Sequence, residues 1–272
     1  MMTNGWRGRL SGVGLVLGPP AADLSVDDAL ERAVAVAVAA EAAGIGTLWV
    51  EEASADPPAR VPYEAYSMLG ALGPRTCRLH LGAAADGSLR RPPSMLAKIV
   101  TGVDVVSHGR AALGLDGDTD RPGDADRLGE ALEVCRAVLE DTHPRVQGRI
   151  YHVEDAVNRP SPVQTDGVPL VVFLAGTGPG LGALAAVCAR SADAVVVGDG
   201  PGGVVDVLTT MARDEVARRR PGARPLVLGR VPEGTGTPDA VARVRSAGAD
   251  GCLVGVPFPW SVEGIGALAA CW

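Results

Sequence analysis

Aromatic residues, paired cysteines and positive charge are all scarce in this chain. Phenylalanine, tyrosine and tryptophan make up 3% of its 272 residues, and the five cysteines include no CxxC pair. An odd number of widely spaced cysteines disfavours a disulfide framework or a zinc site and is typical of a cytoplasmic protein. The net charge of −7, from 32 acidic and 25 basic residues, argues against nonspecific nucleic-acid binding.

Long hydrophobic runs are also missing. No apolar stretch approaches the roughly 18 residues that cross a bilayer, so no membrane contact is expected. The start of the chain, MMTNGWRGRLSGVGLVLGPPAA, imitates a secretory signal, with two arginines before a short apolar run. The same run also suits a first buried strand, which is the interpretation that we favour.

The chain is rich in short apolar segments that alternate with helical patterns. Ser25 with Asp28 predicts the start of the first long helix, and Gly44 its end. Residues 147–167 interrupt the rhythm and predict a short hairpin followed by an extended, proline-rich link. Eight strand–helix units without a dividing linker predict one (β/α)8 TIM barrel over residues 1–272, rather than a doubly wound sheet. The predicted strands are residues 13–17, 46–52, 78–84, 111–115, 168–176, 194–199, 224–230 and 251–256.

A glycine-rich turn, GTGPG at residues 176–180, follows the fifth predicted strand. Free N–H groups and the positive end of a helix dipole at such a turn suit a phosphate. The spacing does not complete G-x-G-x-x-G, because Leu181 occupies the last place. Asp199 nevertheless stands near the position of a ribose-binding acid, so a nicotinamide-binding Rossmann enzyme stays an alternative, as does a turn without a ligand.

Several stretches resemble motifs of the luciferase-like monooxygenase superfamily. RPPSMLAKIVTGVDVVSHGRAALGL is similar to its P-x-x-x-A-K-x-x-x-x-x-D-x-x-S-x-G-R-x-x-x-G-x-G, and AEAAGIGTLWVEE to its A-E-x-x-G-[FY]-D-x-x-W-x-x-[DE]-H. RLGEALEVCRAVLED and GRIYHVEDAVNRPSPVQ resemble its R-x-x-E-A-L-x-x-[LC]-[RK] and G-x-x-[YF]…P-x-P-x-Q. AGTGPGLGALAAVCARSADAVVVG and GTPDAVARVRSAGADGCLV fit as well, so the resemblance covers nearly the whole chain in the family's order. It is nearest to the branch that uses the deazaflavin coenzyme F420, while close cousins use FMN.

The resemblance implies an oxidoreductase whose flavin or deazaflavin ring lies over the barrel mouth. The ring is expected to rest on a bulge at the end of the third strand, which in the family often holds a non-prolyl cis peptide. The phosphate is expected between the loop after the fourth strand and the glycine-rich turn, and Glu52 is the expected catalytic proton partner. The implied cofactor-binding residues are Ala83, Ala84, Ala85, Asp116, Gly117, Gly176, Thr177, Gly178 and Gly180.

The chain departs from the family pattern near this site, and the loops after the first two strands are also short, which leaves a more open mouth. Ala53 replaces the histidine that follows the acid of the second strand, and Glu52 could equally form a plain loop salt bridge. Asp116, Asp118 and Asp120 crowd the loop where an anionic cofactor group is expected, and carboxylates repel such a group unless they turn outward. A calcium loop is a weaker interpretation of these aspartates, because no glutamate stands at the twelfth position.

Two functions follow from these observations. The first is hydride transfer between F420, or FMN, and a small organic substrate, with the protein positioning the cofactor and excluding water. The second is a degenerate, non-catalytic barrel that serves as a binding or partner subunit. No metal site is predicted, and the apolar C-terminal GIGALAACW could cover the barrel's side or a homodimer interface.

Overall fold

A closed barrel of eight parallel strands forms the centre of the molecule. The computed structural model describes residues 5–20, 25–52, 64–85, 91–117, 123–174, 180–198, 203–208, 224–232 and 237–272. The barrel strands are β1 (Val13–Leu17), β2 (Thr47–Glu52), β3 (His80–Ala85), β4 (Ala111–Gly117), β7 (Leu170–Leu174), β8 (Ala194–Val197), β9 (Leu226–Val231) and β10 (Gly251–Val256). Their order around the barrel is β1-β10-β9-β8-β7-β4-β3-β2, and neighbours run parallel. The predicted TIM barrel is confirmed, and the open Rossmann sheet is wrong because β1 pairs with β10 and closes the circle.

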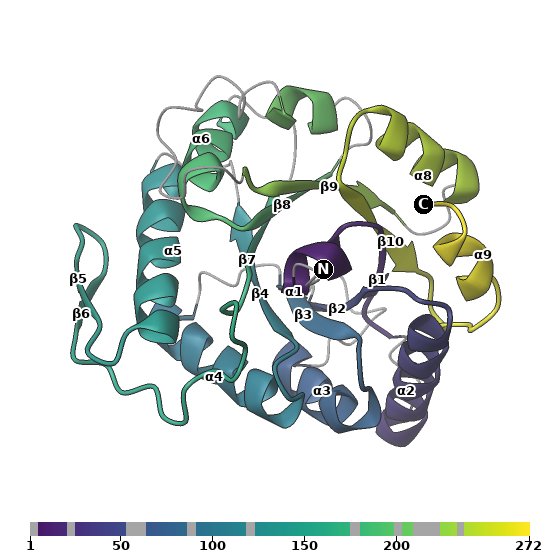
Figure 1. Cartoon of the computed structure of the whole chain (residues 1–272), viewed down its shortest axis with the longest axis horizontal. Helices are drawn as coiled ribbons and strands as arrows, with labels where there is room; N and C mark the ends of the chain where they lie inside the picture. The colour runs from purple at the N-terminus through teal and green to yellow at the C-terminus, as the bar shows by residue number, and fades with distance from the viewer. Residues whose placement is uncertain are drawn as a thin grey trace.

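Helices surround the barrel, as Figure 1 shows. They include α2 (Val26–Ala42), α3 (Ala65–Leu72), η1 (Gly73–Arg75), α4 (Pro93–Val106), α5 (Asp124–Glu140), α6 (Leu181–Ser191), α8 (Thr237–Ser246) and α9 (Ile265–Ala269). The Ser25 hydroxyl accepts from the Asp28 N–H, and Gly44 adopts φ +84°, both as predicted. The predicted hairpin pairs β5 (Arg145–Gln147) with β6 (His152–Glu154) and projects from the outer face of the molecule (Figure 1).

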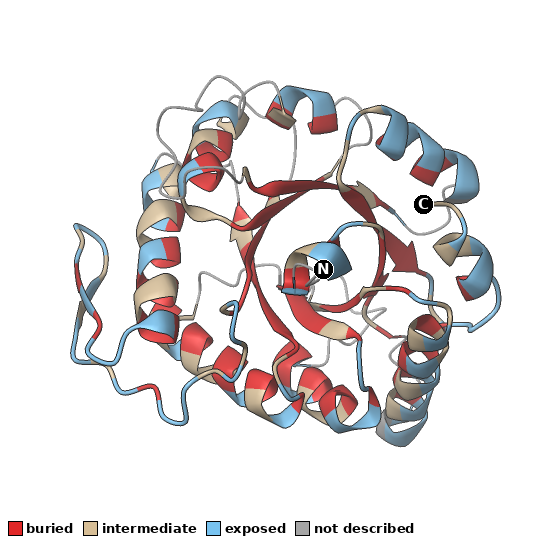
Figure 2. Cartoon of the chain, in the orientation of Figure 1, coloured by how far each residue is buried: buried red, intermediate tan, exposed pale blue. Residues whose placement is uncertain are grey.

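Two apolar layers divide the core according to the alternation of side chains along each strand. The larger layer joins the outward residues of the strands, such as Leu48 and Leu113, to the inner faces of the helices. The smaller layer fills the barrel lumen and includes Val16, Trp49 and Leu228. In Figure 2 the strands are buried almost throughout, while most of the surrounding helices are buried on the side that faces them. Successive side chains of a barrel strand therefore point to different buried layers.

Helix α1 (Gly5–Leu10) closes the N-terminal end of the lumen and lies outside the predicted elements. Its Trp6 and Leu10 are 6% and 3% exposed and belong to the lumen layer. Its backbone approaches the barrel so closely that a Cβ on Gly46, just before β2, would lie 2.0 Å from the Arg9 carbonyl oxygen. Within the segment that imitates a secretory signal, α1 and β1 are thus elements of this fold.

Several residues of the quoted motifs brace the N-terminal end of the barrel. The Asp104 carboxylate on α4 is fully buried and accepts from the Val163 N–H and the Gln164 side-chain amide, each at 2.7 Å. The buried Arg110 guanidinium donates to several backbone carbonyls, including those of Gly73 and Leu79. Active sites of TIM barrels lie at the opposite end, so these motif residues stabilise the fold.

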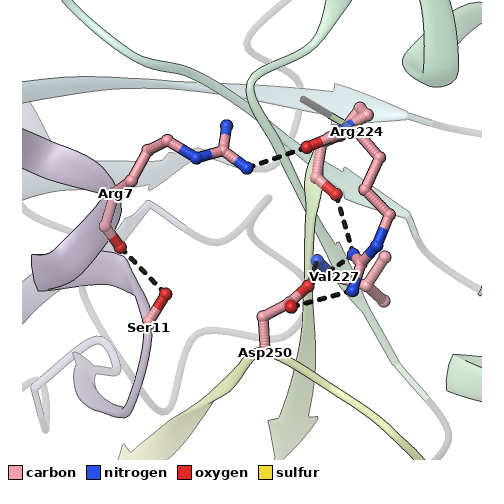
Figure 3. A network of polar contacts seen from close by, with 6 residues as sticks. Arg7, Ser11, Arg224, Val227 and Asp250 are labelled. Atoms are coloured by element: carbon pink, nitrogen blue, oxygen red, sulfur yellow. Dashed lines mark hydrogen bonds and ion pairs between the residues drawn. The ribbon is translucent and has the colours of Figure 1, made fainter. Parts of the chain in front are cut away.

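A similar network ties α1 to the start of β9 (Figure 3). Arg224 and Asp250 form two hydrogen bonds at 2.6 and 2.9 Å, and the Asp250 carboxylate also accepts from the Val227 N–H at 2.8 Å. The Arg7 guanidinium donates to the Arg224 carbonyl at 2.8 Å. These contacts provide hydrogen-bond partners for backbone groups where the strands begin. They lie at the end of the barrel opposite to that at which TIM-barrel active sites are found.

Candidate active site at the barrel mouth

The mouth of the barrel lies at the C-terminal ends of its strands, and inward side chains line it. Trp49, Ala84, Phe173 and Leu228 lie in or against the lumen layer. Because side chains alternate along a strand, Glu51 and Arg230 also point inward, two residues after Trp49 and Leu228. The same alternation turns Asp116 inward on β4, beside Phe173 in the register with β7.

Glu51 and Arg230 form an ion pair across this mouth. The Arg230 Nη2 donates to the Glu51 Oε1 at 2.8 Å, and the two side chains are 24% and 28% exposed. Strands β2 and β9 are separated by β1 and β10, so the contact crosses the lumen. The sequence analysis assigned neither charged residue to the site, nor the aromatic residues Trp49 and Phe173. The inward phase of Trp49 and Leu228 is the signal that locates the ion pair.

An aromatic pair forms the floor beneath these charges. Trp49 is completely buried, and its ring meets that of Phe173 edge to face with centroids 5.1 Å apart. The Trp49 Nε1 donates to the Thr47 hydroxyl at 3.2 Å, which satisfies the indole. A Cβ on Gly82 would lie 2.3 Å from the Trp49 ring, so the glycine makes the room that this indole needs.

Glu52, the predicted catalytic residue, lies on the other face of β2. Its Oε1 accepts from the Arg91 Nη2 at 2.7 Å, and Arg91 also lies 3.4 Å from Glu64 and above the Tyr66 ring. This hydrogen bond raises the pKa of Arg91, and burial raises the pKa of Tyr66. The Glu52 Oε2 and the Tyr66 hydroxyl are buried, and neither has a hydrogen-bond partner among the residues that the structure describes. Glu52 thus occupies the layer between strands and helices, and its catalytic role stays a prediction.

Ala83 and Ala84, near the end of β3, face different sides. Ala84 points into the lumen and is 6% exposed, whereas Ala83 belongs to the outer layer. Pairing with β2 continues to Ala85, but pairing with β4 stops after Gly82. Both cis peptide bonds among the described residues precede proline, at Pro160 and Pro259, so the cis bond expected within Ala83–Ala85 is not found.

The two loops expected to hold a phosphate leave neighbouring strands. Asp116 pairs with Phe173 and Gly117 with Leu174, at the ends of β4 and β7. A Cβ on Gly117 would lie 2.7 Å from the Leu174 side chain, which places Gly117 on the outer face of the strand. Gly180 is the N-cap of α6. Gly176, Thr177 and Gly178 lie outside the described residues, as do Ala53, Asp118, Asp120 and Asp199.

Solved structures share this barrel despite low sequence identity. They include a monooxygenase, RslO1, from Streptomyces bottropensis, with TM-score 0.75, 17% identity and coverage of 95% of this chain and 98% of that one. The coenzyme F420 dependent tetrahydromethanopterin reductase from Methanopyrus kandleri gives TM-score 0.72, 15% identity and coverage of 95% and 96%. The oxygenating constituent of 3,6-diketocamphane monooxygenase from Pseudomonas putida, in complex with FMN, gives TM-score 0.61 and 15% identity, with coverage of 81% of this chain and 66% of that one. These likenesses show the fold.

The family is shown by a family model rather than by sequence relatives. No protein in a search of curated sequences matches the chain. The model described as luciferase-like monooxygenase matches residues 12–232. That range runs from the residue before β1 to the residue after β9 and holds seven of the eight barrel strands. The chain therefore belongs to the luciferase-like monooxygenase family.

Proposed function

We propose that this chain is an oxidoreductase that works with a flavin or deazaflavin bound at the barrel mouth, with F420 as the first choice and FMN as the alternative. The observation that carries the proposal is a mouth with an aromatic floor, a small-residue wall and an inward carboxylate. When bound, such a ring supplies hydride transfer to or from a small organic substrate. The solved neighbours include an F420-dependent reductase and a monooxygenase in complex with FMN, which supports the cofactor class.

The inward residues suit a planar ring. Ala84, Gly198 and Gly255 continue the inward alternation near the ends of β3, β8 and β10, and none carries a side chain larger than a methyl group. Trp49 and Phe173 close the lumen below them and keep water from entering from underneath. A flat ring resting on this surface would have one face covered by protein and the other open to the substrate.

Glu51 is the best-placed proton partner for the reaction. It is the inward acid of β2, whereas its neighbour Glu52 is bound to Arg91 outside the lumen. The ion pair with Arg230 fixes the direction of the Glu51 carboxylate, which a general acid or base requires. Glu52 therefore serves as a matched control, since it has the same chemistry one residue along the chain.

Phosphate binding by the glycine-rich turn and the N-terminus of α6 completes the proposal. The first turn of α6 carries no acidic residue, so the positive end of its dipole is not neutralised there. The two relevant loops leave adjacent strands, which brings them to one side of the mouth. Placing a negative charge at Thr177 should therefore weaken binding of a phosphorylated cofactor.

The mouth also holds a feature that favours the second function, a non-catalytic barrel. Asp116 turns inward where an anionic cofactor group is expected, and Ala53 replaces the family's histidine. Cofactor affinity distinguishes the two functions, because an oxidoreductase must bind its cofactor whereas a non-catalytic barrel would not.

The test is a titration of the purified protein with F420, FMN and NADPH, followed by cofactor fluorescence. Micromolar binding of F420 or FMN, weakened at least about tenfold by Thr177→Asp, is the expected result. With a substrate in hand, Glu51→Gln should lower kcat by about 10²-fold or more while Glu52→Gln leaves it within a few-fold. No binding of either cofactor would support the non-catalytic barrel.

The cellular setting belongs to the same proposal. No helix within the described ranges is long and apolar enough to span a membrane. We propose a cytoplasmic protein that acts on a small molecule, and a homodimer as its assembly. Sedimentation of the purified chain would test the dimer directly.

A further inference from the structure

We propose that Arg230 binds an anionic oxygen of the substrate, so that the substrate class is a small organic acid with an apolar skeleton. This inference rests on the proposed function, because it names the substrate of the same mouth. It starts from an arginine that points into a barrel lumen rather than to solvent. Arg230 lies on β9 two residues after the buried Leu228, and its side chain is 24% exposed.

The described part of the chain uses only one nitrogen of the Arg230 guanidinium. Its Nη2 donates to Glu51, and the remaining N–H groups make no hydrogen bond to any residue that the structure describes. A guanidinium presents five donors in a planar fork, so one carboxylate leaves an edge that can take a second anion. The ion pair fixes the plane of this edge from the opposite side of the lumen, which reduces the rotamer entropy lost on binding.

The two strands that flank β9 place few atoms beside this edge. The neighbours of Arg230 along the sheet are Leu253 on β10 and, one register step beyond Val197, Gly198. Leu253 is buried in the lumen layer, and Gly198 has no side chain. Leu253 therefore packs within the lumen, and at Gly198 there is no side chain that could cover the guanidinium.

The aromatic floor indicates that the remainder of the substrate, apart from its acidic group, is apolar. Phe173 is partly exposed and supplies the apolar surface of the floor, and the completely buried Trp49 packs against it from within the lumen. A hydrocarbon ring or short chain resting there buries its surface, while a carboxylate reaches Arg230. The net charge of −7 gives anions no general attraction to the protein, so recognition of an acid depends on this local cation.

The experiment compares cyclohexanecarboxylate with cyclohexanecarboxamide, which share a skeleton and differ in charge. Binding is followed by calorimetry and by tryptophan fluorescence, in the presence and absence of F420 or FMN. The wild-type chain should bind the acid about 10- to 100-fold more tightly than the amide. Arg230→Gln should abolish that preference, and Arg230→Lys should retain only part of it, because an ammonium keeps the charge but loses the fork.

Two further variants control for the change in net charge and for the loss of the partner of Glu51. Arg145→Gln changes the net charge equally. This side chain is 65% exposed, and its hairpin of β5 and β6 lies outside the ring of helices (Figure 1), so the acid preference should persist. Arg230→Gln leaves Glu51 without its partner, so the double variant Glu51→Gln/Arg230→Gln removes both charges and should also show no preference. Thermal unfolding verifies that each variant is folded.

The outcomes separate this inference from the proposed function. Equal binding of acid and amide, no binding of either up to about 10 mM, or a preference that survives Arg230→Gln overturns the organic-acid class. If F420 or FMN still binds in those cases, the proposed function stands. If the acid binds through Arg230 but neither cofactor binds, the anion site is supported and the proposed function fails.

Discussion

At the scale of single residues, adding one methyl group inside the lumen should destabilise the fold, even at a glycine that no sequence motif singles out. Gly82 is such a position, because a Cβ there would lie 2.3 Å from the ring of the buried Trp49. Gly82→Ala should lower the free energy of unfolding by about 1–3 kcal/mol, measured by urea denaturation, because the indole must move in a packed core. Gly102→Ala on α4 is the control: its Cβ meets nothing within 4 Å, and helix propensity predicts no loss. Equal effects of the two changes would contradict this packing.

His80 gives the lumen a pH dependence at its N-terminal end. Burial, followed by the charges of Arg9 and Arg110, lowers the pKa of His80 from 6.5 to about 4. Between these values the unfolded chain takes up a proton that the folded chain refuses, so the free energy of unfolding falls as the pH falls through this window. The loss should reach at most about 3 kcal/mol.

Denaturation at a series of pH values checks this expectation. His80→Gln should show a shallower decline in stability between about pH 7 and pH 4 than the wild-type chain. Burial acts to raise the pKa of Glu41, but backbone hydrogen bonds from Arg78, Leu79 and Cys77 outweigh it and lower the pKa. Protonation of Glu41 therefore lowers the free energy of unfolding in acid in both proteins. Identical slopes would show that His80 is not held neutral by the fold.

At the scale of elements, α1 acts as a plug for the barrel. Trp6 and Leu10 are buried at the end of the lumen, and Arg7 links the helix to the start of β9. Trp6→Ala should cost about 3–5 kcal/mol of unfolding free energy, because it leaves a cavity at the N-terminal end of the lumen layer. Gly8→Ala, on the exposed face of the same helix, meets nothing within 4 Å and should cost almost nothing. A small effect of Trp6→Ala would mean that the barrel closes without its plug.

At the scale of the whole molecule, the charge of −7 should slow the approach of an anionic cofactor. Raising the salt from about 10 mM to about 150 mM shortens the Debye length from about 30 to about 8 Å and screens this repulsion. The association rate constant of FMN, followed by stopped-flow fluorescence, should therefore rise about two- to threefold. Riboflavin lacks the phosphate and should show no such rise. A fall with salt would instead indicate a locally positive mouth.

The architecture could be predicted from the sequence because it depends on local patterns. Apolar runs such as residues 251–256, the Ser25 cap and the left-handed Gly44 mark where strands and helices begin and end. Eight alternating units then leave a closed parallel barrel as the favoured arrangement. The hairpin of β5 and β6 was also visible, as a break in that rhythm. The segment before β1 was not, since six residues of α1 carry no helical period.

The candidate site depended on information that no local pattern holds. In the stretch TLWVEE, residues of both faces are buried, so the sequence does not distinguish the lumen side from the helix side. Glu52 and Glu51 are chemically equal there, and only the closed barrel turns Glu51 inward toward Arg230, 179 residues away. The sequence by itself determined the order and type of the elements, because these follow from propensity and periodicity. The tertiary structure decided which charges meet in the lumen, because that requires strands far apart in the chain to enclose a common space.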